Sequence, residues 1–113
     1  MLRTLIKVLP NRRGGLQAKL TGVDGFTGRG DISLTIWNSG EKTLDVALRG
    51  VAGKTAGVYA GDTLIAEVAI VNGRADTSLH SRKGAVLPDL TPDTRIDVRQ
   101  NGQAILSGSL TES

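Results

Sequence analysis

The one histidine of the sequence is the first candidate for acid–base or nucleophilic chemistry. His80 lies in the segment LHSR, with Ser78 and Ser81 close by. A serine hydrolase needs a serine, a histidine and a carboxylate that the fold brings together. No nucleophile-elbow pattern surrounds either serine, so we expect His80 to be an exposed loop residue. A hydrolase that uses His80 with an acid of the 80–93 loop stays open as a minor alternative.

The sequence gives weaker evidence for metal-binding or phosphate-binding sites. The sequence has no cysteine and a single histidine, which excludes cysteine-based zinc sites and argues against transition-metal sites. The acids Asp24, Asp31, Asp89 and Asp93 are too sparse for a calcium loop, so we interpret them as turn and capping residues. The GKT sequence at 53–55 lacks the earlier glycine and the following helix of a phosphate loop. We therefore expect no metal and no cofactor.

Basic residues gather in the first part of the chain. Residues 1–19 hold five bases and no acid, whereas residues 20–113 hold nine bases and eleven acids. Such cations can neutralise phosphates on nucleic acids or lipid head groups. The chain has only three aromatic residues, which leaves few for stacking on bases. The candidate binding residues for an anionic partner are Arg3, Lys7, Arg12, Arg13 and Lys19, and the alternative is a solubilising tail.

The chain of 113 residues is long enough for one domain with its own core. With one Phe, one Trp and one Tyr, this core must be aliphatic. No apolar run approaches the roughly 20 residues of a membrane-spanning helix, and the first nine residues lack the apolar stretch of a signal peptide. We expect a cytoplasmic protein, or a secreted or periplasmic one if a leader has been trimmed.

The clearest strand pattern lies in residues 30–50. Apolar side chains at every second position predict two strands that each bury one face. A three-residue loop over residues 38–40 places Leu34 opposite Leu44 and Gly40 in the left-handed conformation that glycine tolerates. Further alternating or β-branched stretches predict strands at 16–20, 55–60, 63–71, 94–100 and 103–110, with a break at 10–15 and a long loop at 80–93.

Two Asn-Gly pairs, at 72–73 and 101–102, predict type I′ hairpins. Pairing outward from the first puts Ile70 opposite Ala75, Val68 opposite Thr77 and Ala66 opposite Leu79, with Val71 opposite Arg74 on the other face. Pairing outward from the second puts Val98 opposite Ile105. Leu106 then falls on the face of Asp97, which we expect to point outward. Either a bulge near Ser107 and Gly108 redirects the strand, or both faces of this strand are partly covered by the rest of the protein.

Seven or eight strands at this spacing predict an all-β fold. We expect a single antiparallel β-sandwich, either immunoglobulin-like or a partly closed barrel, over residues 16–113. Residues 1–15 are expected to be a basic N-terminal arm or an edge strand.

Residues 28–110 also resemble small bacterial β-sandwich domains of unknown function. The resemblance is carried by GRGDISLTI, LDVALRGVAG, GDTLIAEVAIVNGRADTSL and AVLPDLTPDTRIDVRQNGQAILSGSL. A fainter resemblance is to CHRD-type domains, which are secreted β-sandwiches with an Ala-His-Ile-His segment. The matching residues 55–59 contain no histidine, so the resemblance implies the fold and no metal function.

Together these patterns predict a non-enzymatic structural or interaction module. Its expected partner is a protein or a second copy of the chain, bound through an exposed strand edge. The first alternative is a binding domain for carbohydrate or an anionic polymer, with the basic N-terminal residues in contact with the polymer. The second is the hydrolase that uses His80.

Overall fold

The computed structural model describes residues 12–81, 84 and 87–113, which form nine strands and no α-helix. In this part of the chain, no helix is long and apolar enough to cross a membrane. The strands are β1 (Arg12–Gly22), β2 (Arg29–Trp37), β3 (Lys42–Arg49), β4 (Thr55–Ala60), β5 (Thr63–Ala69), β6 (Arg74–His80), β7 (Arg95–Gln100), β8 (Gln103–Ser109) and β9 (Thr111–Glu112).

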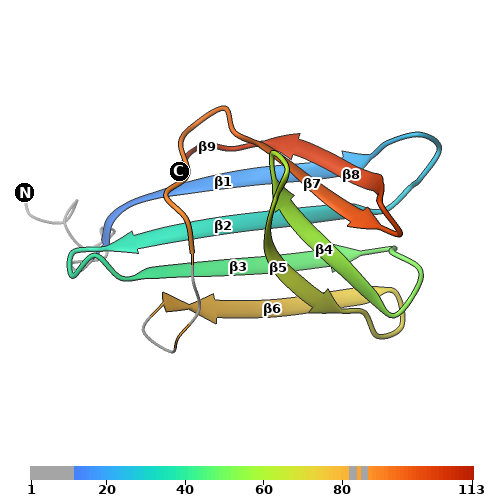
Figure 1. Cartoon of the computed structure of the whole chain (residues 1–113), viewed down its shortest axis with the longest axis horizontal. Helices are drawn as coiled ribbons and strands as arrows, with labels where there is room; N and C mark the ends of the chain where they lie inside the picture. Colours follow the sequence, from blue (N-terminus) through green and yellow to red (C-terminus); the bar gives the residue numbers. More distant parts are fainter. Residues whose placement is uncertain (1–11, 82–83, 85–86) are drawn as a thin grey trace, which may run out of the picture.

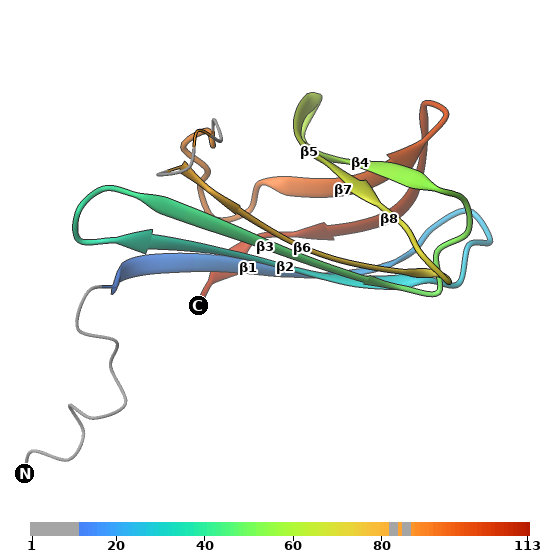
Figure 2. The same ribbon diagram turned by 90° about the horizontal axis from the view of Figure 1, so that it is seen from below.

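All neighbouring strands are antiparallel, in the order β5-β4-β7-β8-β1-β2-β3-β6, and β9 pairs with β1. The long strands β1, β2, β3 and β6 form one layer, and β5, β4, β7 and β8 form the other (Figures 1 and 2). β1 and β8 pair only at Thr21–Ser107 and Gly22–Leu106, where the two layers join. The predicted all-β fold is confirmed, in the form of a nearly closed barrel.

The core lies between the layers and is aliphatic, as the composition predicted. Its least exposed side chains include Leu48, Val58 and Ile96, each at 0% exposure. Residues 87–94, which lead into β7, cross the layer of long strands (Figure 1), and their Leu87 and Leu90 pack against the core. This segment therefore covers the end of the sandwich that β4 and β5 leave open.

The predicted β2–β3 hairpin is confirmed in its register and its loop. Leu34 pairs with Leu44. The Trp37 amide donates to the Glu41 carbonyl at 2.9 Å and closes the three-residue loop, with Gly40 at φ 91°.

The break predicted at residues 10–15 is wrong where the structure describes it. β1 already begins at Arg12, and an irregularity between Arg12 and Gly14 shifts its register against β2. A strand can accommodate an extra residue as a bulge without ending. Residues 1–11 lie outside the described residues.

The β7–β8 hairpin forms at its Asn-Gly turn, as predicted, but its bulge lies elsewhere. Val98 pairs with Leu106 and Arg99 with Ala104, so Ile105 is the extra residue. The predicted pairing of Val98 with Ile105 is therefore wrong, as is the predicted bulge near Ser107 and Gly108. The bulge lets consecutive residues Ile105 and Leu106 both enter the core, at 4% and 1% exposure.

Substitution of Gly108 in β8 provides a test of how closely the two layers pack where they join. A β-carbon there would overlap the Lys19 carbonyl oxygen and lie 2.9 Å from Leu20 Cδ2. We expect Gly108→Ala to lower the free energy of unfolding by about 1–3 kcal/mol, the usual cost of overpacking. Gly14→Ala is the control, because a β-carbon at that position meets nothing within 4 Å. Urea denaturation of both variants checks the prediction, and equal stabilities would contradict it.

Candidate interaction site

The barrel is open between β5 and β6, which lie at the two ends of the strand order. Their turn has the predicted conformation, with φ 53° at Asn72 and 77° at Gly73. Val71 and Arg74 then exchange two backbone hydrogen bonds of 2.8 and 3.1 Å. Beyond this bridge the two strands diverge (Figures 1 and 2). We call the opening between β5 and β6 the seam.

The rest of the predicted β5–β6 hairpin is therefore wrong. Ile70, Val68 and Ala66 do not pair with β6; the Val71–Arg74 pair is the one that forms. β5 pairs instead with β4, and β6 pairs with β3 along its whole length. Each of the two strands thus pairs along one edge with a strand of its own layer, and the layers separate beyond the turn.

The pattern of the bridge shows which backbone groups face the seam. Alternate residues of an antiparallel strand direct their N–H and C=O groups to the same side. Because Val71 and Arg74 bond across the seam, the same side is faced by Glu67 and Ala69 of β5 and by Asp76 and Ser78 of β6. Among the described residues, no hydrogen bond joins the two edges beyond the bridge. The seam therefore offers two strand edges to an added strand.

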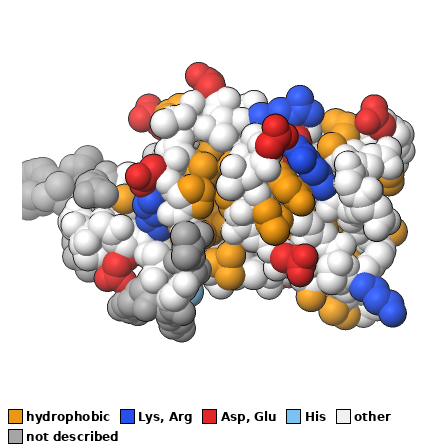
Figure 3. Space-filling view, viewed as in Figure 1, with side chains coloured by type: hydrophobic (Ala, Val, Ile, Leu, Met, Phe, Trp, Pro, Cys, Tyr) orange, Lys and Arg blue, Asp and Glu red, His pale blue; other side chains and the backbone are white. Residues whose placement is uncertain are grey.

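Apolar side chains lie in and beside the seam. Val68 and Ile70 of the β5 segment are buried, and Leu79 of β6 packs against the core. Leu64 and Val71 are 50% and 66% exposed. In Figure 3, apolar side chains gather in the middle of the face seen in Figure 1, with charged side chains beside them.

The outer rims of the seam carry charged side chains, the base Arg74 of β6 among them. Glu67 is exposed on β5. On β6, Asp76 forms a 3.0 Å ion pair with Arg49 of β3. The Ser78 hydroxyl donates to the Asp45 carboxylate. Glu67 is the rim carboxylate with no ion pair among the described residues.

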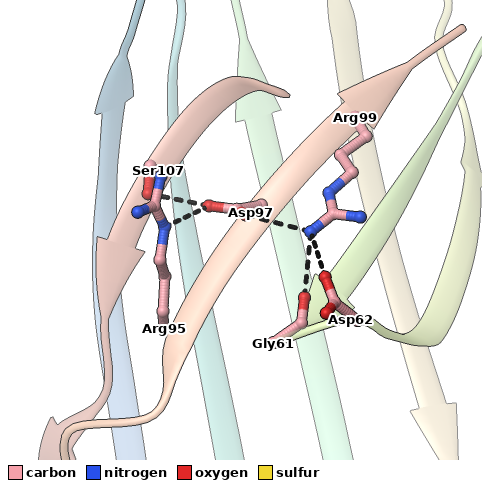
Figure 4. A network of polar contacts seen from close by, with 6 residues as sticks. All are labelled: Gly61, Asp62, Arg95, Asp97, Arg99 and Ser107. Carbon is pink, nitrogen blue, oxygen red and sulfur yellow. Dashed lines mark hydrogen bonds and ion pairs between the residues drawn. The ribbon is translucent and has the colours of Figure 1, made fainter. Parts of the chain in front are cut away.

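A polar network holds the β5 rim in place from the outside of the barrel (Figure 4). Asp97 Oδ1 accepts hydrogen bonds of 2.8 Å from Arg95 Nε and from Ser107 Oγ, and its Oδ2 accepts one of 3.3 Å from Arg99 Nη2. Asp97 was expected to point outward into solvent, yet it is only 6% exposed. The neighbouring polar side chains cover it because they converge on its two oxygens.

Arg99 extends this network to the tip of the β4–β5 hairpin. Its Nη2 donates to the Gly61 carbonyl at 3.0 Å and to Asp62 at 3.3 Å. The guanidinium also lies 4.3 Å from the centre of the Tyr59 ring, within the range of a cation–π contact. β7 thus anchors the hairpin whose second strand is one rim of the seam. The alternation Arg95-x-Asp97-x-Arg99 places all three charges on one strand face, and this was the sequence signal for the network.

The network also sets the ionisation of Asp97. Burial opposes the charged form and on its own would raise the pKa. The hydrogen bonds from Arg95, Ser107 and Arg99, together with the positive charge of Arg95, outweigh burial and lower the pKa of Asp97 below its usual value. The ionised carboxylate therefore stabilises the fold.

The five basic residues predicted to bind an anion are placed only in part. Arg3 and Lys7 lie outside the described residues, and Arg12 and Arg13 begin β1. Lys19 is exposed on β1 and pairs with Asp31 of β2. It lies seven residues from Arg12, about 23 Å along an extended strand.

His80 lies at the end of β6 rather than in a loop, and it is half-buried. Its Nδ1 lies 3.2 Å from Thr43 Oγ1, which also accepts a 3.0 Å hydrogen bond from Trp37 Nε1. These three side chains line a hollow of about 470 Å³. Asp89, from the loop that the hydrolase alternative invokes, forms an ion pair with Lys42.

No family model matches the sequence, and a search of curated proteins finds no significant match. The seam and its anchoring network therefore supply the argument for function.

We expect Asp97→Asn to lower the free energy of unfolding at neutral pH by about 2 kcal/mol, because it breaks charge-assisted bonds in a buried site. Asp62→Asn is the control: the Asp62 side chain is fully exposed, and exposed ion pairs contribute at most about 1 kcal/mol. Denaturation at neutral pH compares the two variants, and equal losses would contradict the prediction.

The contribution of Asp97 also predicts a pH dependence. A carboxyl whose folded-state pKa is lowered stabilises the fold fully above its unfolded-state pKa of about 3.9. That stability is lost as the pH falls through the folded-state pKa. The difference in unfolding free energy between the native protein and Asp97→Asn should therefore shrink below pH 4. A difference that stays constant down to pH 2 would show that the carboxylate charge is not its source.

Proposed function

We propose that this chain is a non-enzymatic interaction module that self-associates through the strand edges of the seam. The observation that supports this function is the pair of edges beyond the Val71–Arg74 bridge. Backbone donors and acceptors of Glu67, Ala69, Asp76 and Ser78 face a space in which no described strand completes their pairing. A strand placed along either edge gains backbone hydrogen bonds and covers apolar surface.

The composition of the rims also favours association. Natural proteins protect open strand edges with prolines, lysines and other charged residues, bulges or very short strands. Here β5 and β6 each have seven residues and contain no proline or lysine, and their protective features are the bulge at Ile65 and the charges of Glu67, Arg74 and Asp76. Small residues, Ala69 and Ser78, stand on the two edges where the strands diverge. Such edges bind a further strand unless something prevents it.

The test removes the edges without removing internal hydrogen bonds. The N–H groups of Ala69 and Ser78 face the seam, so proline at either position leaves the internal ladders intact and blocks the edge. Light scattering over a range of concentrations should show the native protein associating, with Ala69→Pro and Ser78→Pro at least about tenfold weaker, a loss of about 1.4 kcal/mol.

Ala69→Ser and Ser78→Ala are the matched controls, since both keep the backbone N–H and should associate as the native protein does. Circular dichroism verifies that each proline variant is folded. A native protein that stays monomeric at high concentration would refute the proposal. So would folded proline variants that associate normally.

A further inference from the structure

The geometry and charge of the seam also point to its occupant. Resting on the proposed function, we propose that residues 2–9 of one copy bind as an added strand in the seam of a second copy. This assigns a role to the basic N-terminal segment. The argument rests on the length, pattern and charge of the segment and on the reach of the chain.

The length and pattern of residues 2–9 suit such a strand. Eight extended residues span about 27 Å, and β5 and β6 have seven residues each. In an extended strand Leu2, Thr4, Ile6 and Val8 share one side, while Arg3, Leu5, Lys7 and Leu9 share the other. The first side has three aliphatic residues and no charge, so it can face the core, and both bases lie on the second side.

The seam has the complementary chemistry. Its inner side presents aliphatic residues such as Val68 and Leu79. Its outer rims carry Glu67 on β5 and both Arg74 and Asp76 on β6, and Asp76 is already paired with Arg49. Glu67 has no ion pair among the described residues, so an added strand with its aliphatic side inward can direct Arg3 or Lys7 toward this carboxylate. Since β5 and β6 run in opposite directions, the added strand is parallel to one rim and antiparallel to the other.

Chain geometry requires the segment to come from a second copy. Arg12 pairs with Trp37 in β1, and β2, β3 and β6 separate β1 from the seam. Strands lie about 4.8 Å apart, so a strand beside β6 is four spacings, about 19 Å, from β1. Three residue steps from Arg12 back to residue 9 span at most about 11 Å. The segment therefore cannot reach the seam of its own chain.

Paired substitutions in the full chain test whether residues 2–9 occupy the seam. Ile6→Asp places a charge on the side that faces the core and should weaken association at least about tenfold, because an unpaired charge is costly to bury. Leu5→Lys places a charge on the outer side, where it faces the carboxylate of Glu67, and should not weaken association. Glu67→Lys should weaken association through repulsion, whereas Glu112→Lys on β9 should not.

Complementation between variants makes the test decisive. Ala69→Pro retains the segment and lacks the edge, whereas Ile6→Asp retains the edge and lacks the segment. Neither should self-associate, but an equimolar mixture should form a species with the mass of two chains. If Ile6→Asp associates like the native protein while Ala69→Pro does not, the seam binds something else and this inference is wrong while the proposed function stands. If Ile6→Asp loses association but the mixture stays monomeric, the inference is also wrong.

Discussion

Competition between strands for backbone hydrogen bonds determines the form of this molecule. A strand has two edges, and a buried layer requires each edge to find a partner. β3 pairs with all of β6, and β4 with β5, which leaves the Asn72-Gly73 turn with the single bridge between Val71 and Arg74. Because the partners belong to different layers, the strands that leave this turn must separate. The opening is thus a direct result of how the two layers are paired.

The anchoring network bears on the same opening. Arg99 contacts Gly61, Asp62 and Asp97 at once, and it stacks on Tyr59. The tip of the β4–β5 hairpin is therefore attached to β7, which belongs to the same layer. This attachment holds the β4–β5 hairpin to the rest of its layer. A contact on the outside of the barrel thereby helps to fix the position of β5 beside the seam.

Local patterns in the sequence predicted the strands well, and they did so for physical reasons. Alternation reports which side chains are buried, so the register of the β2–β3 hairpin followed from residues 30–50 and the conformation of Gly40. Alternation does not report which distant strand lies alongside. The pairing of β6 with β3 therefore could not be derived, and the Asn72-Gly73 turn suggested a complete hairpin instead.

The same limit applies to single residues. Asp97 has the position of an outward-facing residue, and its burial depends on Ser107 from the next strand as well as on its own neighbours. The bulge at Ile105 depends on whether the core accepts two consecutive aliphatic residues. Both features are set by three-dimensional packing. The basic residues of 1–19 were identified from charge alone, which says nothing about a partner surface.

The pairing of β1 with β8 and β9 has a consequence for biosynthesis. Thr21 meets Ser107, and Leu16 meets Glu112, across more than eighty residues of intervening chain. Contacts between such distant residues form slowly, because a large loop must close first. On the ribosome, the layer of long strands emerges before β7 and β8 exist to cover it. A nascent chain at that stage presents bare aliphatic surface, which is the kind of surface that molecular chaperones bind.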